Sequence, residues 1–356
     1  MSCLLSALFI LFAFVSVEAQ AVKITVKPNS IYIEKTSAAQ NLNFDFVLEN
    51  TTNENLSLSE VEVSVFDSKG KLVLRKFIDG NGVRPSIMTV PNRELEPNKP
   101  LLVFNPFYSF ASDAELSRML YKFTFETKDR KKQFVSETAV SPVFYQTKTN
   151  LILPVKGRSI IYDGHDFYSH HRRFDYMFEP IRAFGFSTNF MRYSYDFVPA
   201  NEAGEMFQGD EKNNAGYFGF GANLYAAGDG KIVSVVDDKP DNRSFDESQL
   251  TTNRMVLWGN YIVIDHLNGE YSLYGHIKQK SAKVKIGDTV KQNQIIAQMG
   301  ASGSSKFPHL HYELQNGADT DAEGLPSYFR NFQKILGAKT QFVKLGQIDS
   351  GDIVQR

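Results

Sequence analysis

The chain has 356 residues, enough for two domains of ordinary size, and its 42% hydrophobic and 22% charged residues are typical of a folded globular protein. Its 39 basic residues nearly balance its 40 acidic residues, and no basic run stands out. This balance argues against a nucleic-acid partner held by positive charge and leaves neutral or zwitterionic ligands open.

The first 19 residues are predicted to be a secretory signal. Leu4–Val15 is apolar but too short to span a bilayer comfortably, and small residues at Val17 and Ala19 suit cleavage before Gln20. No basic residue precedes the apolar run, so an uncleaved membrane anchor is the alternative. Cys3 is the only cysteine, so a cleaved chain needs no disulfide and any metal site in it uses nitrogen and oxygen ligands. We therefore expect an exported protein, periplasmic or extracellular, with no membrane span after cleavage.

Residues 20–145 show short stretches of period-two alternation separated by turn signals, which favours an immunoglobulin-like β-sandwich. No cluster of His, Asp or Glu suggests chemistry in this part, so we expect a binding or spacer module, with a protein partner as one open role. The clearest predicted strands are Val22–Val26, Leu42–Leu48, Val61–Phe66 and Tyr121–Glu126.

Residues 146–155 are predicted to be a linker, residues 156–340 a second all-β domain and residues 341–356 a C-terminal tail. All 7 histidines lie between His165 and His311, which places the chemistry in the second domain. A strong hairpin signal, Leu267–Glu270, joins two predicted strands there. One short helix is expected around Tyr328–Leu336.

Two histidines one residue apart lie in the predicted strand Pro308–Leu314. Because side chains alternate along a strand, His309 and His311 point to one face, and Leu310 and Tyr312 point to the other. Two imidazoles side by side suit a metal or proton-transfer site. The alternative is a pair of surface histidines on an edge strand.

Several further motifs occur in order around this strand. With them, residues 150–336 resemble the lysostaphin and LytM type of zinc-dependent peptidoglycan endopeptidases. The resemblance implies an antiparallel β-sheet domain, a Zn²⁺ cofactor, and peptidoglycan stem or cross-bridge peptides as substrate. It also implies that His311 binds zinc and that His309 and His276 are catalytic. The matching segments are Ala227–Val233, Gly259–His266, Tyr274–His276, Val284–Val290, Gly303–Ser305 and Pro308–His311.

One segment departs from the family pattern, in which a histidine and an aspartate, spaced H-x-x-x-D, provide two ligands from one strand. Asp196 fits the aspartate, but Arg192 stands at the histidine position. Some relatives take this histidine from an upstream loop, and Ser169-His170-His171 resembles that arrangement. His170 is therefore the first choice for the third ligand, followed by His171 and then His165.

Two histidines and one carboxylate hold Zn²⁺ with an open position for water, whose pKa falls from about 15.7 towards about 7. The sequence therefore predicts an exported zinc endopeptidase that cleaves peptidoglycan cross-links. The first alternative is an inactive LytM-like protein that binds or regulates cell-wall hydrolases. A second is a biotinyl- or lipoyl-type carrier, suggested by Val284–Gly300, although that segment lacks a lysine between methionines.

Overall fold

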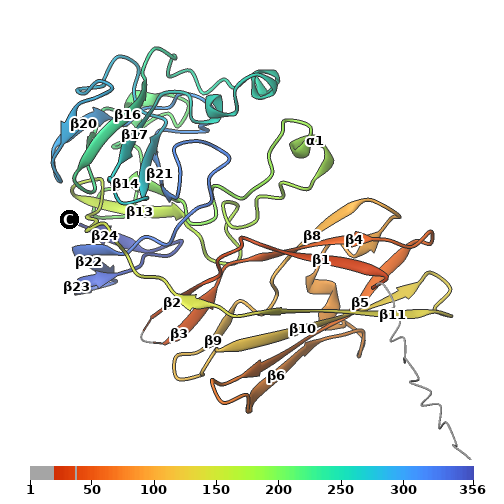
Figure 1. The fold of residues 1–356 in the computed structure, drawn as a ribbon. Helices are drawn as coiled ribbons and strands as arrows, with labels where there is room; N and C mark the ends of the chain where they lie inside the picture. Colours follow the sequence, from red (N-terminus) through yellow and green to blue (C-terminus); the bar gives the residue numbers. More distant parts are fainter. Residues whose placement is uncertain (1–19, 37) are drawn as a thin grey trace, which may run out of the picture.

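The computed structural model describes residues 20–36 and 38–356, and nearly all of its regular structure is β-strand (Figure 1). The predicted all-β class is therefore confirmed, whereas the predicted signal at residues 1–19 lies outside the described residues. Within the described part, no helix has the length and apolar character needed to cross a membrane. The red-to-yellow strands form an N-terminal domain, and the green-to-blue strands form a second domain beside it.

The N-terminal domain is built from three sheets around a shared apolar core. In its central strands, alternate residues are apolar and buried. Val63 pairs with Tyr121 and Val61 pairs with Phe123, so branched and aromatic side chains line the same face. This layered arrangement is consistent with a sandwich, and its immunoglobulin-like subtype stays a prediction. The sheets are β1 (Val22–Lys27), β4 (Asp45–Asn50) and β8 (Pro100–Phe104); β11 (Gln133–Val140), β10 (Arg118–Thr127), β5 (Leu56–Phe66) and β6 (Leu72–Ile78), with β7 (Glu94–Leu95) beside β5; and β12 (Val143–Phe144), β2 (Tyr32–Lys35), β3 (Ala39–Leu42) and β9 (Ser109–Ala111).

The second domain is organised by one 10-stranded sheet, with a two-stranded sheet of β15 (Asn223–Tyr225) and β20 (Ile295–Gln298) beside it. Short helical turns, including α1 (Glu179–Arg182), lie in its loops. The order in the large sheet is β19 (Thr289–Val290), β16 (Gly230–Val236), β17 (Tyr261–Asp265), β18 (Tyr271–Gly275), β21 (Leu310–Gln315), β14 (Tyr195–Pro199), β13 (Arg158–Asp163), β24 (Ile353–Gln355), β22 (Phe329–Leu336) and β23 (Lys339–Gly346).

The helix predicted at Tyr328–Leu336 is wrong, because this segment is strand β22. Phe329 and Phe332 are buried against the sheet, and Gly337, with φ of 63°, turns the chain into β23. The positive φ suits glycine, which has no Cβ to clash in the left-handed region. Because β23 and β24 extend the large sheet, residues 341–356 belong to the second domain and do not form a separate tail.

The predicted linker also contributes to the second domain. Leu151, Leu153 and Val155 are buried in that domain's core, and Leu151 bridges Phe329. Burial of these apolar side chains in the core removes apolar surface from water and so stabilises the second domain.

Candidate metal centre

The centre of the large sheet brings Asp196 and His311 together. β14 and β21 are antiparallel neighbours, and Asp196 pairs directly with His311 in their register. The Nδ1 atom of His311 lies 3.1 Å from Oδ1 of Asp196, and both side chains are buried. The sheet therefore places an imidazole and a carboxylate next to each other, away from bulk water.

A third side chain, His171, reaches this pair from the loop between β13 and β14. Its side chain is 1% exposed, and its Nε2 atom lies 3.5 Å from Oδ1 of Asp196. Its Nδ1 atom lies 3.2 Å from the carbonyl oxygen of Gly164. A carbonyl only accepts hydrogen bonds, so Nδ1 carries the proton and the lone pair on Nε2 faces Asp196.

These three residues fit the requirements of Zn²⁺. His171, Asp196 and His311 each offer one ligand atom, and these atoms lie within 4.8 Å of one another. Ligands at about 2.0–2.2 Å from a tetrahedral zinc ion are separated by about 3.3–3.6 Å. The distances of 3.1 and 3.5 Å from the Asp196 oxygen to the two imidazole nitrogens are close to that separation. Two neutral imidazoles and a carboxylate are also the donor types that zinc takes in catalytic sites.

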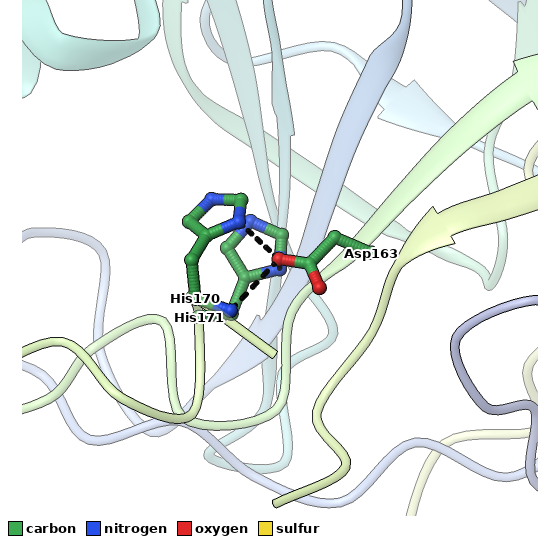
Figure 2. Close-up of side chains that lie close together, drawn as sticks. All are labelled: Asp163, His170 and His171. Atoms are coloured by element: carbon green, nitrogen blue, oxygen red, sulfur yellow. Dashed lines mark hydrogen bonds and ion pairs between the residues drawn. The ribbon is translucent and has the colours of Figure 1, made fainter. Parts of the chain in front are cut away.

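The structure separates the three loop histidines that the sequence left as alternatives. His170 is 67% exposed and pairs with Asp163, as Figure 2 shows, rather than with Asp196 or His311. His165 is buried, but its Nε2 lies 2.9 Å from Glu34 of the N-terminal domain. Only His171, the second choice, lies at Asp196 and His311.

His309 and His276 lie beside this cluster. The Nε2 atom of His309 is 3.4 Å from Oδ1 of Asp196, and the rings of His276 and His309 are 4.7 Å apart. In each ring Nδ1 donates to a carbonyl at 2.8 Å, that of Phe307 for His309 and that of Ser302 for His276. The Nε2 atoms are therefore available for proton exchange in the cleft.

Burial and neighbouring charges set the protonation of the cluster. Burial lowers the pKa of His171 to about 3. Burial, together with the nearby His309 and His311, also holds the pKa of His276 well below its usual range. Burial raises the pKa of Asp196, but His171 and His309 lower it by more, so it lies well below its usual range. At neutral pH Asp196 is therefore a carboxylate, and His171 and His276 are neutral imidazoles. These are the protonation states in which such groups bind metal.

His311 differs, because it lies between two carboxylates. Burial lowers its pKa, but hydrogen bonds to Asp196 and Glu313 outweigh burial and raise the pKa to about 9. A positive charge is thus favoured at this position, and either a proton or a metal ion can provide it.

Glu313 orients the ring of His311. Its Oε1 lies 2.5 Å from Nε2 of His311 and accepts a 3.0 Å hydrogen bond from Nε1 of Trp258. A carboxylate behind a ligating histidine fixes the tautomer and strengthens the ligand. The sequence interpretation gave Glu313 no role, although alternation along β21 places it on the same face as His309 and His311.

The side chain of Arg192 binds partners outside this cluster. Strand β14 begins at Tyr195, and Arg192 lies in a turn before it, where its backbone amide donates to the carbonyl of Asn189. Its buried side chain binds Asp45 of the N-terminal domain, with 2.7 Å between Nη1 and Oδ2. The position that holds a ligand histidine in the family motif therefore contributes to the domain interface.

The cluster opens into a cavity of about 510 Å³. Its walls are mainly aromatic and apolar, and among its lining residues Lys306 is the only lysine or arginine. Such a lining suits a largely neutral chain whose carbonyl groups approach the cluster. The lining residues are Tyr162, His170, His171, Phe174, Met191, Asp196, Leu257, Trp258, His276, Ser304, Lys306, Phe307, His309 and His311.

Comparison with known proteins relates part of the second domain to a family. Residues 217–323 match Peptidase family M23. Peptidoglycan DD-endopeptidase ShyC of Vibrio cholerae is 36% identical over 98 residues, which cover 27% of this chain and 18% of the relative. ShyB of the same organism is 36% identical over 94 residues, covering 26% of this chain and 18% of the relative. The chain thus spans less than a fifth of the length of these curated relatives.

Among solved structures, the catalytic domain of lysostaphin from Staphylococcus simulans is 21% identical, with a TM-score of 0.26, over 48% of this chain and 88% of that domain. The stretch of this chain that matches the family contains His276, His309 and His311, whereas His171 and Asp196 precede it. Over residues 217–323, within its second domain, this chain is therefore similar to Peptidase family M23.

Proposed function

We propose that this protein is an exported zinc-dependent endopeptidase that hydrolyses peptide bonds in peptidoglycan cross-links. The observation that carries the proposal is the buried cluster of His171, Asp196 and His311, with His276 and His309 at its side. Relatives named peptidoglycan DD-endopeptidases support the substrate class.

In this proposal the zinc ligands are His171, Asp196 and His311, and His171 replaces the His170 first expected from the sequence. Asp196 contributes the negative charge of the set, and Glu313 and the Gly164 carbonyl hold the two imidazoles with a lone pair facing inward. Zinc bound there supplies Lewis acidity to polarise a carbonyl and to acidify water.

The two remaining histidines perform the proton transfers. Neutral His276, with its Nδ1 proton on the Ser302 carbonyl, accepts a proton from water at Nε2 and delivers it to the leaving amine. His309, whose Nε2 lies 3.4 Å from Oδ1 of Asp196, is placed to stabilise the oxygen on which negative charge develops. The buried position of both rings keeps bulk water from competing for these bonds.

The cleft and the N-terminus suit this substrate and location. The rings of Tyr162 and Phe307 line the cleft, meet edge to face at 4.8 Å between centres and can pack on a peptide. Lys306 in the same lining can bind a substrate carboxylate. Peptidoglycan lies outside the cytoplasm, so the apolar leader-like run before Gln20 is interpreted as an export signal. We therefore place the protein in the periplasm or outside the cell, at the cell wall.

Metal analysis and peptidoglycan digestion by the full-length protein test this function. We expect one zinc ion per chain and release of peptide fragments, both lost in His311→Ala. A wild-type protein without zinc and without digestion would overturn the proposal and favour a non-catalytic protein that binds or regulates cell-wall hydrolases.

A further inference from the structure

The loop that carries His171 contacts the N-terminal domain at four of its residues. This ligand loop, residues 164–173, follows β13 and has little regular structure of its own. Its contacts with the N-terminal domain comprise ion pairs, an aromatic stack and a cation–π contact. His165 lies 2.9 Å from Glu34, Phe167 stacks on Tyr108 at 4.2 Å, Arg172 binds Asp45, and Arg173 lies 5.0 Å from the ring of Phe104.

The central contact is made by Asp45 of β4. This carboxylate is fully buried, with Oδ1 2.6 Å from Nη1 of Arg172 and Oδ2 2.7 Å from Nη1 of Arg192. Arg172 also donates from Nη2 to the carbonyl of Phe44 at 2.8 Å. A buried guanidinium that donates to two fixed acceptors has a well-defined position. If it moved away from either acceptor, a polar group would remain buried without a hydrogen-bond partner, which costs free energy.

Arg172 directly follows His171 in the chain, so its position constrains the histidine. The buried amide of Asn189 donates to the carbonyls of both residues, at 3.1 Å for His171 and 3.2 Å for Arg172. The amide of Arg172 donates to Oγ of Ser169 at 3.1 Å. The backbone around His171 is therefore fixed from within its own domain by Asn189 and Ser169, and from the N-terminal domain by Asp45.

Apolar packing extends the same interface to the other side of the site. Val47 and Leu102 of the N-terminal domain belong to one buried cluster with Phe190 and Trp258 of the second domain. Phe190 contacts Trp258 at 5.2 Å between ring centres, and Trp258 donates to Glu313, which orients His311. The N-terminal domain thus packs against supports of two of the proposed metal ligands.

We infer that the N-terminal domain is a structural part of the metal centre and that Asp45 is a positioning residue for His171. The inference rests on the proposed function in that His171 holds the zinc ion. The inference also gives Arg192 a role. Arg192 stands at the histidine position of the H-x-x-x-D pattern and binds Asp45. Asp45 in turn holds the loop that provides His171. The domain is then more than a spacer, and zinc affinity depends on a residue in another domain.

The test compares two full-length variants that each change one polar side chain between the domains. Asp45→Asn removes the charge that holds Arg172. Tyr145→Phe is the matched control, because the Tyr145 hydroxyl, which packs near Tyr32, donates to Glu270 at 2.5 Å and makes no contact with the ligand loop. Zinc affinity is measured by competition with a chelator, and ligand geometry by the visible spectrum of the Co²⁺-substituted protein.

We expect Asp45→Asn to bind zinc about 10- to 100-fold more weakly, as is usual for loss of an outer-shell support, with an altered Co²⁺ spectrum. Tyr145→Phe should keep the wild-type affinity and spectrum. A folded Asp45→Asn protein with wild-type zinc affinity would overturn the inference while leaving the proposed function intact. A wild-type protein that binds no zinc would overturn both.

A second variant covers the case in which Asp45→Asn fails to fold, since it leaves two buried arginines without their carboxylate. Phe104→Leu keeps an apolar side chain at the interface but removes the ring that Arg172 and Arg173 face, at 5.4 and 5.0 Å. We expect weaker zinc binding and faster amide hydrogen exchange in residues 164–173. Unchanged affinity together with unchanged exchange in this loop would overturn the inference.

Discussion

His311 and Glu313 lie two residues apart on β21, with 2.5 Å between Nε2 of the histidine and Oε1 of the glutamate. Both side chains are buried, and Trp258 holds the glutamate from the other side. The carboxylate therefore fixes the ring so that Nδ1 faces Asp196, and the orientation of this proposed ligand depends on a residue that does not touch the metal.

Glu313→Gln should weaken zinc binding by about 10- to 100-fold, because the neutral amide keeps the size of the side chain but loses the charge that polarises His311. Chelator competition on the purified protein measures this change. Glu211→Gln, on an exposed loop, is the control and should bind zinc as the wild type does. Equal affinities for all three proteins would contradict the role given to Glu313.

The neighbouring histidines of the ligand loop provide a second test. His171→Ala should lose the bound zinc ion, since it removes one of three buried donors. His170→Ala should retain it, because His170 is exposed and pairs with Asp163. Metal content per chain, determined on dialysed protein, separates the two variants. Retained zinc in His171→Ala and loss in His170→Ala would restore the assignment first made from the sequence.

His276 and His309 should be needed for turnover and not for metal retention. We expect His276→Ala and His309→Ala to digest peptidoglycan about 10²- to 10⁴-fold more slowly, the usual effect of removing a general acid or base. Zinc content should stay at one ion per chain. Loss of zinc from His276→Ala would instead indicate that this residue supports the metal.

Removal of zinc should destabilise the protein, because the three donors surround the ion only in the folded state. Free zinc at 100 times its dissociation constant stabilises a folded protein by about 2.7 kcal/mol. Chelation should therefore lower the melting temperature, and added zinc should restore it. His311→Ala should melt at the same temperature with and without chelator; a chelator-induced drop in that variant would mean that the metal binds elsewhere.

The pair of His165 and Glu34 predicts a pH-dependent contribution to stability. Burial lowers the pKa of His165, but the adjacent Glu34 carboxylate raises it by more, so the net shift is upward from 6.5. A raised histidine pKa stabilises the fold fully below the unfolded value and loses this effect as pH rises through the folded value. The difference in melting temperature between wild type and His165→Gln should therefore be larger near pH 6 than near pH 9. A melting-temperature difference that grows with pH would refute the raised pKa of His165.

Local patterns predicted the strand that carries two of the candidate site residues. Alternation in the predicted strand Pro308–Leu314 places His309 and His311 on one face, and both line the cavity, although β21 itself begins at Leu310. The same rule failed at Phe329–Leu336, where a short apolar run fits either a helix or a strand, and pairing with β23 decides between them.

By itself, the sequence determined the all-β class, the strand that carries His309 and His311, and the match to Asp196, because these depend on a residue's own neighbours. Only the tertiary structure shows that His171 lies next to Asp196 and His311 while His170 pairs with Asp163. The two are adjacent in a loop without a repeating side-chain direction, and their directions depend on Asp163, Gly164 and the N-terminal domain. The contact between Asp45 and Arg172 joins residues 127 positions apart. Such a contact leaves no local pattern, since it depends on how two separately formed sheets pack against each other.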